Sequence, residues 1–442
     1  MAAIITEKFR QHNATQFFES FTEASASTYY LFVGKATAYT SSTTGGSDSS
    51  PPTPSDSPSD TEFYAWDSML AAKNVTSSDV TFSIPRRNWV NGTTYDMYDD
   101  NISSSNTATS GASNLYDSTF YFMTSDYRVY KVLDNNGGTA YSGAEPTSTS
   151  TGPFALGGYV LKYMYQVTTS EAAKYLTSDF IPVSDDSTIS AAAVDGKIES
   201  LKITAGTGYT NGTYYAAVYG DGTSAGTSSG AIVRITVSGG TIQSFGLTAG
   251  SDTTIHAGGA GYTFGTVNLA SGYTFSDSSL SSASGIGGSG GSIEVVISPK
   301  NGHGNSAIVE LGGHFVMTST TLTQAENDDI TTANDFRQVG LVVDPTNYGT
   351  STVASASTRR QTFVVKASSV SGTFDTDEKI TQATTGAVGK VVEFDSTNQL
   401  LYFQQERFGD FGTNSTTGDH SVFEGTNVIT GATSSATFTP SS

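Results

Sequence analysis

Short runs of aromatic and β-branched residues recur along the chain, separated by Gly, Ser, Thr, Asn and Asp. Such runs are typical of strands joined by turns, because branched and ring side chains suit a pleated surface while glycine and small polar residues accept turn conformations. The pattern therefore predicts a mainly β protein, with an antiparallel β-sandwich core and few short helices. Strands are predicted at 28–39, 80–84, 159–167 and 293–297, with a hairpin over 118–133.

Three segments show helical spacing instead. Residues 5–21 place Ile5, Phe9 and Phe17 near helical intervals, which predicts a short helix with an aromatic face. A second short helix is expected at 63–70, and a third at 170–177 with Ser170 as its N-cap.

Changes of composition divide the chain. Residues 41–60 form a Ser- and Pro-rich run that contains four of the 11 prolines, and it is predicted to be an extended surface loop. The predicted division is a first part of the core domain at 1–189, an inserted Gly/Ser/Thr-rich β module at 190–292, a second part of the core at 293–346, a linker at 347–362 and a C-terminal β module at 363–442.

Two internal repeats support the two added modules. Residues 196–206 return as 240–250, which predicts a small repeated β unit with Ile198, Ile242, Ile203 and Leu247 buried. Residues 374–387 return as 423–436, with Phe, Ile, Thr and Ala in register. The second repeat predicts one compact module of two related halves.

Charge and composition exclude several functional classes. The 21 basic and 41 acidic residues give a net charge of −20, which argues against nucleic-acid binding because that surface requires clustered Lys and Arg. Cysteine is absent, so disulfides and thiolate chemistry are excluded. No run of 18 apolar residues and no secretory signal pattern is visible, so we expect neither a membrane span nor a membrane partner.

A search for catalytic or metal-binding patterns gives weak candidates. His303, Glu310 and His314 are spaced unlike a helical zinc motif, and a structural loop or hydrogen-bonding role is favoured over metal binding. The acidic segments 96–101 and 375–378 lack the spacing of a calcium loop, so we interpret them as solvated turns. No nucleophile elbow or phosphate loop is present. We therefore predict no catalytic residues, no cofactor, no bound metal and no enzymatic activity.

One motif stands out as a candidate protein interface: Ile84, Pro85, Arg86, Arg87, Asn88 and Trp89. Arg and Trp are enriched at the energetic centres of interfaces, because guanidinium groups and indole rings bury area with defined geometry. The alternative is a structural corner, with Trp89 in the core and the two arginines paired with Asp96, Asp99 or Asp100. The two interpretations are compatible.

Several segments in a fixed order carry a resemblance. They are 6–10, the strand at 30–34, the proline-rich loop, Trp66 with Met69, the Ile84–Trp89 motif, 127–134, 158–167, 179–183, and Phe336, Arg337, Gln338 and Val339 before Asp344 and Pro345. Together they resemble the tail baseplate wedge subunit of T-even-type contractile-tailed bacteriophages. The resemblance covers about 1–185 and 293–346, and the family has an Asp where this chain has Asn88.

The resemblance implies a structural protein of the baseplate wedge, which acts in baseplate assembly and links wedge proteins. It also implies a homodimer, contacts with other wedge proteins, no catalysis, and a place in the virion tail after assembly in the host cytoplasm. Phe336, Arg337 and Gln338 join the Ile84–Trp89 motif as candidate interface residues. Two alternatives stay open: a tail-fibre or adhesin-like glycan-binding protein, whose repeat modules would hold the glycan, and a polysaccharide depolymerase.

Overall fold

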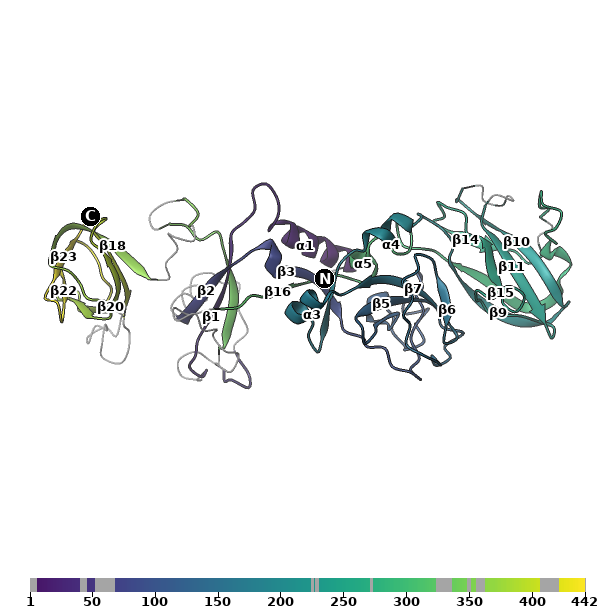
Figure 1. The fold of residues 1–442 in the computed structure, drawn as a ribbon, viewed down its shortest axis with the longest axis horizontal. Coiled ribbons are helices and arrows are strands. Elements are labelled where there is room, and N and C mark those ends of the chain that lie inside the picture. The colour runs from purple at the N-terminus through teal and green to yellow at the C-terminus, as the bar shows by residue number, and fades with distance from the viewer. Residues whose placement is uncertain are drawn as a thin grey trace. The chain divides into compact units, whose positions relative to one another are not determined.

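The computed structural model describes residues 6–39, 46–51, 68–223, 226, 230–270, 273–322, 336–347, 351–354, 362–405 and 421–441. The fold is mainly β, as the sequence predicts, and is built from several antiparallel sheets (Figure 1). The chain forms two compact units, one of residues 1–26 and 76–320, the other of 27–75 and 321–442. Only 46–51 of the proline-rich loop is described, and most of the expected linker also lies outside the described residues. The described residues contain no helix long and apolar enough to cross a membrane.

A four-stranded sheet with both faces buried lies at the centre of the first unit. Its order is β4 (Tyr121–Met123), β5 (Arg128–Asp134), β7 (Tyr159–Gln166) and β6 (Phe154–Leu156). The predicted hairpin is confirmed, because Phe122 pairs with Tyr130 across β4 and β5. One face packs around Phe120, Tyr121 and Tyr165, and the other around Phe122, Tyr130, Tyr141 and Tyr159.

A second sheet of this unit has the order β16 (Phe315–Thr318), β3 (Val80–Pro85) and β8 (Phe180–Val183). Helix α1 (Glu7–Glu19) contacts β16 and β3, and Phe18 stacks on Phe82 at a centroid distance of 4.5 Å. The predicted N-terminal helix is therefore confirmed with a shorter range. The N-cap of helix α3 (Thr169–Tyr175) is Thr168 and not Ser170, because the Thr168 hydroxyl accepts from Glu171 N while Glu171 Oε2 accepts from Thr168 N.

A seven-stranded sheet contains the Gly-rich segment. Its order is β12 (Thr241–Ile242), β11 (Ile232–Ser238), β10 (Gly212–Gly220), β14 (Gly265–Val267), β15 (Gly287–Val296) and β9 (Ser200–Tyr209), and β13 (Thr254–Ala257) also pairs with β11. Tyr209 N donates to Gly240 O over 3.0 Å, so the two end strands of this order meet.

The short helices of the first unit are α4 (Ser187–Ala192), α5 (Ala307–Glu310), η1 (Ser77–Asp79), η2 (Leu115–Asp117) and η3 (Ala283–Gly285).

The first repeat is only partly equivalent in structure. Ile198 and Ile242 are buried as predicted, and Ile203 is half-buried. Leu247, however, is 40% exposed, so its predicted burial is wrong. The second copy bends after β12, where Gly246 N donates to Thr253 O, and Leu247 therefore lies in a turn instead of a long strand like β9.

The second unit contains a three-stranded sheet with the order β17 (Gln338–Val343), β1 (Tyr29–Gly34) and β2 (Met69–Val75). Met69 and Leu70 belong to β2, so the helix expected at 63–70 is wrong there, and 63–67 lies outside the described residues. Val33 pairs with both Val339 and Ala71, and Tyr29 pairs with both Val343 and Val75.

The second unit also contains a closed barrel of β18 (Phe363–Ser371), β21 (Leu400–Gln405), β20 (Ala387–Asp395), β19 (Lys379–Gln382), β22 (Ile429–Gly431) and β23 (Thr437–Pro440). Thr381 of the first repeat copy pairs with Thr430 of the second, and these two residues are equivalent in the repeat. The two copies therefore meet about a local two-fold axis. Ile380 and Ile429 are fully buried, and so are Ala387 and Ala436.

Candidate functional site

The Ile84–Trp89 motif forms a corner between β3 and the edge of the four-stranded sheet. Ile84 is fully buried, and Pro85 O accepts a 2.7 Å hydrogen bond from the Tyr121 hydroxyl. Beyond Pro85 the chain pairs with β4 instead: Met123 N donates to Arg87 O over 2.7 Å, and Trp89 N donates to Met123 O over 2.8 Å. Proline at the end of β3 suits this change of partner, because it lacks a ladder donor.

The two arginines brace this corner through backbone carbonyls. Arg86 donates from Nη1 to Thr177 O over 2.6 Å and from Nε to Asn88 Oδ1 over 2.9 Å. Arg87 donates from Nη2 to Tyr116 O over 2.8 Å. Its guanidinium lies 4.4 Å from the Tyr121 ring centroid, a cation–π contact, and burial lowers the pKa of Arg87.

The expected ion pairs with nearby acids are wrong. Among the described residues, neither Arg86 nor Arg87 forms an ion pair with Asp96, Asp99 or Asp100. The carboxylate of Asp96 instead accepts from the backbone N–H and hydroxyl of Ser110 and of Thr119, at 2.6–3.0 Å. These four hydrogen bonds occupy the acceptor sites of the Asp96 carboxylate, so no site is left for a guanidinium group.

Trp89 occupies the rim of the aromatic cluster and not its centre. Its ring meets Tyr141 edge-on at a centroid distance of 5.8 Å, and its side chain is half-buried. Asn88 is exposed beside it, and Val90 is 54% exposed. The corner therefore holds the fold together and also presents polar and apolar atoms to solvent.

Phe336, Arg337 and Gln338 lie in the other compact unit, at the start of β17. Arg337 donates from Nε and Nη2 to both oxygens of Asp48 at 2.8 Å, and these bonds lower the pKa of that carboxyl. Gln338 Oε1 accepts from the Ser68 hydroxyl, and Phe336 is half-buried. The candidate interface residues therefore belong to two different compact units.

Strand β17 is an edge of its sheet, since in the described part of the chain it pairs only with β1. Val339 is 65% exposed and Val343 is 50% exposed. Natural proteins commonly protect such edges with charges or coverings, because an open ladder and apolar side chains invite pairing with another chain.

The histidines of the weak metal candidate do not come together. His314 Nδ1 lies 3.4 Å from Glu7 Oε2, whereas His303 is buried beside Lys131. The described residues contain no group of three His, Cys, Asp or Glu that could hold a metal ion.

Lys131 in β5 is the centre of a buried charged cluster that the sequence analysis did not identify. Its Nζ donates to Glu310 Oε2 over 2.8 Å, lies 2.9 Å from His303 Nδ1 and is 3.8 Å from the Tyr98 ring centroid. The Lys131 and Glu310 side chains are 0% and 2% exposed. Burial, with Lys131 close by, holds the pKa of His303 well below its usual value, so His303 is neutral and accepts from the ammonium. The only sequence signal was a lysine inside an apolar strand.

The acidic segments are only in part the solvated turns expected from the sequence, because Asp100, Asp375 and Asp377 are exposed whereas the other three acids are buried. Asp96 and Asp99 are 1% and 4% exposed, and Asp99 pairs with Lys202. In the barrel, Glu378 is 5% exposed and accepts from Asp375 N, Thr433 N, Ser434 N and the Ser434 hydroxyl. Each carboxylate fixes a loop by accepting backbone donors.

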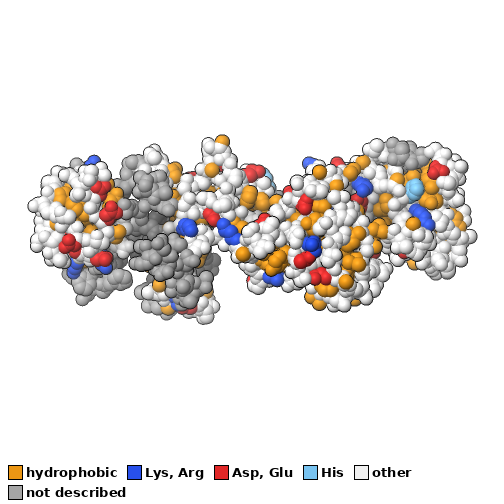
Figure 2. Space-filling view, in the orientation of Figure 1, with side chains coloured by type: hydrophobic (Ala, Val, Ile, Leu, Met, Phe, Trp, Pro, Cys, Tyr) orange, Lys and Arg blue, Asp and Glu red, His pale blue; other side chains and the backbone are white. Residues whose placement is uncertain are grey.

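The surface carries few charges for its size. Figure 2 shows basic side chains that are spread singly over the face in view, not gathered into a patch. Nucleic-acid binding requires clustered cations, so this face has none of the electrostatic features of such a site.

The comparison with protein families gives one match. Residues 3–151 match the family model described as Bacteriophage T4, Gp8. The match includes α1, the corner at Ile84–Trp89 and strands β1 to β5, and it does not extend to the seven-stranded sheet or the barrel. No curated protein matches the chain. Over residues 3–151, this chain is therefore similar to Gp8 of bacteriophage T4.

Proposed function

We propose that this protein is a structural component of the contractile-tail baseplate wedge, which acts in baseplate assembly and links wedge proteins to one another. The observation that carries the proposal is the Gp8 family match over 3–151. The proposal includes assembly in the host cytoplasm, a final place in the tail baseplate, and no catalytic step.

Two surfaces support a linking role. At the corner, Asn88 and Val90 are exposed while Arg86 and Arg87 hold the backbone rigid beneath them. A rigid support lowers the entropy lost when a partner binds. At β17, exposed valines on an open edge offer main-chain pairing together with apolar contact.

The family resemblance also supports a homodimer. A dimer with two-fold symmetry uses the same patch on both copies, so it leaves other surfaces for different wedge proteins. We propose that the corner and β17 contact such partners, with each copy of the dimer contributing one of each surface.

Co-expression with the tail proteins encoded beside it tests the proposal. We expect a complex on size-exclusion chromatography with light scattering, containing two copies of this chain. Val90→Glu at the corner and Val339→Lys on β17 should each weaken the complex at least tenfold. The matched control is Val428→Lys, whose valine is 46% exposed in the barrel.

Circular dichroism must show that each variant folds. A monomer that binds none of these proteins, yet binds host glycans on an array, would overturn the structural role in favour of an adhesin. Release of reducing sugar from host envelope would favour a depolymerase instead.

A further inference from the structure

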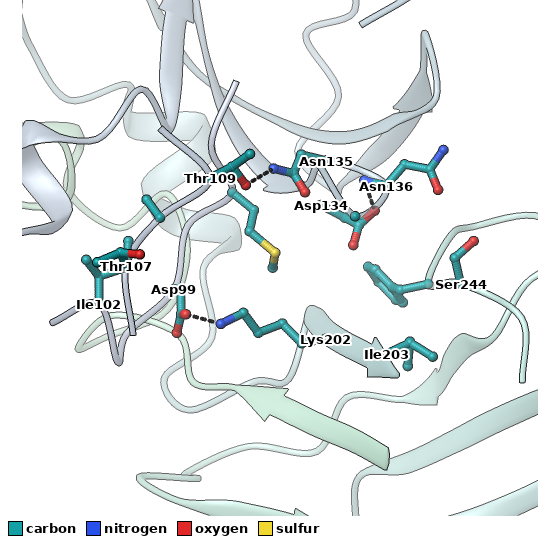
Figure 3. A pocket seen from close by; sticks show the side chains of 14 residues that line it. Asp99, Ile102, Thr107, Thr109, Asp134, Asn135, Asn136, Lys202, Ile203 and Ser244 are labelled. Atoms are coloured by element: carbon teal, nitrogen blue, oxygen red, sulfur yellow. Dashed lines mark hydrogen bonds and ion pairs between the residues drawn. The ribbon is translucent and has the colours of Figure 1, made fainter. Parts of the chain in front are cut away.

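A cavity of about 280 Å³ lies inside the first unit, where the Gp8-family segment meets the seven-stranded sheet. Three stretches of chain enclose it: the loop 97–109, the turn 134–137 after β5, and residues 202–203 and 244–245 beside β9 and β12 (Figure 3). Because the family match ends at 151, the third of these stretches, 202–203 and 244–245, lies outside the matched segment.

Most polar groups in this cavity already have partners. Asp99 pairs with Lys202 and accepts from Asn101 N at 2.9 Å. Asn135 donates from Nδ2 to Tyr95 O over 2.9 Å and accepts from Gly138 N over 3.0 Å.

Of the two carboxylates that line the cavity, only Asp134 lacks a cationic partner among the described residues. Asp134 is only 7% exposed, and one oxygen of its carboxylate accepts a hydrogen bond from Asn136 N over 2.8 Å. The other oxygen points into the cavity in Figure 3. Among the described residues Asp134 forms no ion pair, and burial raises the pKa of its carboxyl to about 6. With Asp99 neutralised by Lys202, the cavity has one uncompensated negative charge.

The rest of the wall is mixed, with Thr107, Thr109 and Ser244 among its polar residues and four large apolar side chains beside them. Met97, Ile102, Ile203 and Phe245 face the same space. A buried carboxylate is costly without a cation, and the apolar side chains favour a cation that has a hydrocarbon body. A calcium ion needs six to eight oxygen ligands, and the described residues hold no cluster of three acids or histidines.

We propose that this cavity binds a small aliphatic amine, with its ammonium group on Asp134 and its methylene chain against Phe245 and Met97. An uncharged polyol of the same size would leave the carboxylate charge unpaired. The site is independent of the wedge contacts, since neither the corner nor β17 lines the cavity.

Calorimetry on the full chain at pH 7.5 tests the proposal with two probes of equal length, 1,4-diaminobutane and 1,4-butanediol. We expect saturable one-to-one binding of the diamine and none of the diol. Asp134→Asn keeps an oxygen for Asn136 N and should weaken diamine binding at least tenfold. Asp377→Asn, which alters an exposed acid in the barrel, should leave it unchanged.

A second variant and a pH series keep the test independent of the Asp134 substitution. Thr107→Trp fills the cavity from its exposed loop and should also abolish binding. Lowering the pH from 7.5 to 5 should weaken binding about tenfold, because protonation removes the charge of a carboxyl with a pKa of about 6. Equal binding of both probes, calcium binding without amine binding, or binding unaffected by both variants would each overturn the proposal.

Discussion

The four-stranded sheet β4–β5–β7–β6 and the C-terminal barrel are stabilised in different ways. The sheet is buried on both faces, and large rings fill the space around a buried Lys131–Glu310 pair. The barrel has a smaller core of Ile, Ala, Val, Leu and Phe, and its ion pair Lys390–Asp377 lies at the surface. In the barrel the polar groups that matter, Glu378 and Gln382, bind backbone instead of other charges.

The two regions should therefore be sensitive to different kinds of substitution. A buried charge pair is costly to break because removing one partner leaves the other charge in a dry interior. A small symmetric core is stabilised by the packing of methyl groups. Truncating the side chains at two equivalent positions should therefore lower the free energy of unfolding by equal amounts.

Glu310→Gln, in α5, should be the most damaging single change to the core that surrounds this sheet. It leaves the Lys131 ammonium without a carboxylate and should lower the free energy of unfolding of the first unit by about 3–5 kcal/mol. Urea unfolding of the full chain, followed by tyrosine fluorescence, measures the loss. A change below about 1 kcal/mol would show that the pair does not stabilise this sheet.

Ile380→Ala and Ile429→Ala should each cost about 2–4 kcal/mol, because both side chains are fully buried in the barrel. The local two-fold axis requires the two losses to agree within about 1 kcal/mol, given the usual spread at chemically identical sites. Hydrogen exchange of peptides from β19 and β22 in the full chain measures both. A large loss at one position only would contradict structural equivalence.

Glu378→Gln should cost about 1–3 kcal/mol, since the carboxylate accepts four hydrogen bonds that an amide cannot all accept. These bonds lower the pKa of Glu378 below its usual value. Its stabilising effect is therefore complete above the pKa of the unfolded chain, near 4.5, and is lost as the pH falls through the lower folded value. The same exchange experiment at several pH values should show barrel protection falling on acidification in the parent but not in Glu378→Gln.

Lys390→Met gives the smallest effect and serves as the counterpart of Glu310→Gln. The Lys390 and Asp377 side chains are 49% and 77% exposed, so losing their 3.2 Å contact should cost less than about 0.5 kcal/mol. Barrel exchange should then match the parent chain. A loss comparable to that of Glu310→Gln would remove the contrast between buried and surface pairs.

Sequence patterns predicted the features that depend on neighbouring residues. Two apolar runs on either side of Ser125 and Asp126 predicted the hairpin at 118–133, and helical spacing predicted α1. The in-register repeat predicted the matched positions Ile380 and Ile429, which pack in one core. These features depend on the spacing of side chains within a few residues, or on a repeat in the amino-acid sequence.

Features that depend on distant partners were missed. Glu310 lies 179 positions from Lys131, and nothing near either residue predicts their contact. Leu247 resembles its repeat partner Ile203, yet a turn after β12 exposes it. The structural-corner interpretation paired Arg86 and Arg87 with acids, but the carbonyl oxygens of Thr177 and Tyr116 accept their hydrogen bonds.

The proposed function requires that this chain is built into the tail baseplate. Quantitative mass spectrometry of purified virions, separated into capsid and tail fractions, tests it most directly. The proposal predicts this chain in the tail fraction, in a fixed ratio to the other baseplate proteins. Its absence from purified tails, with the protein recovered only in the free lysate, would contradict a structural role in the wedge.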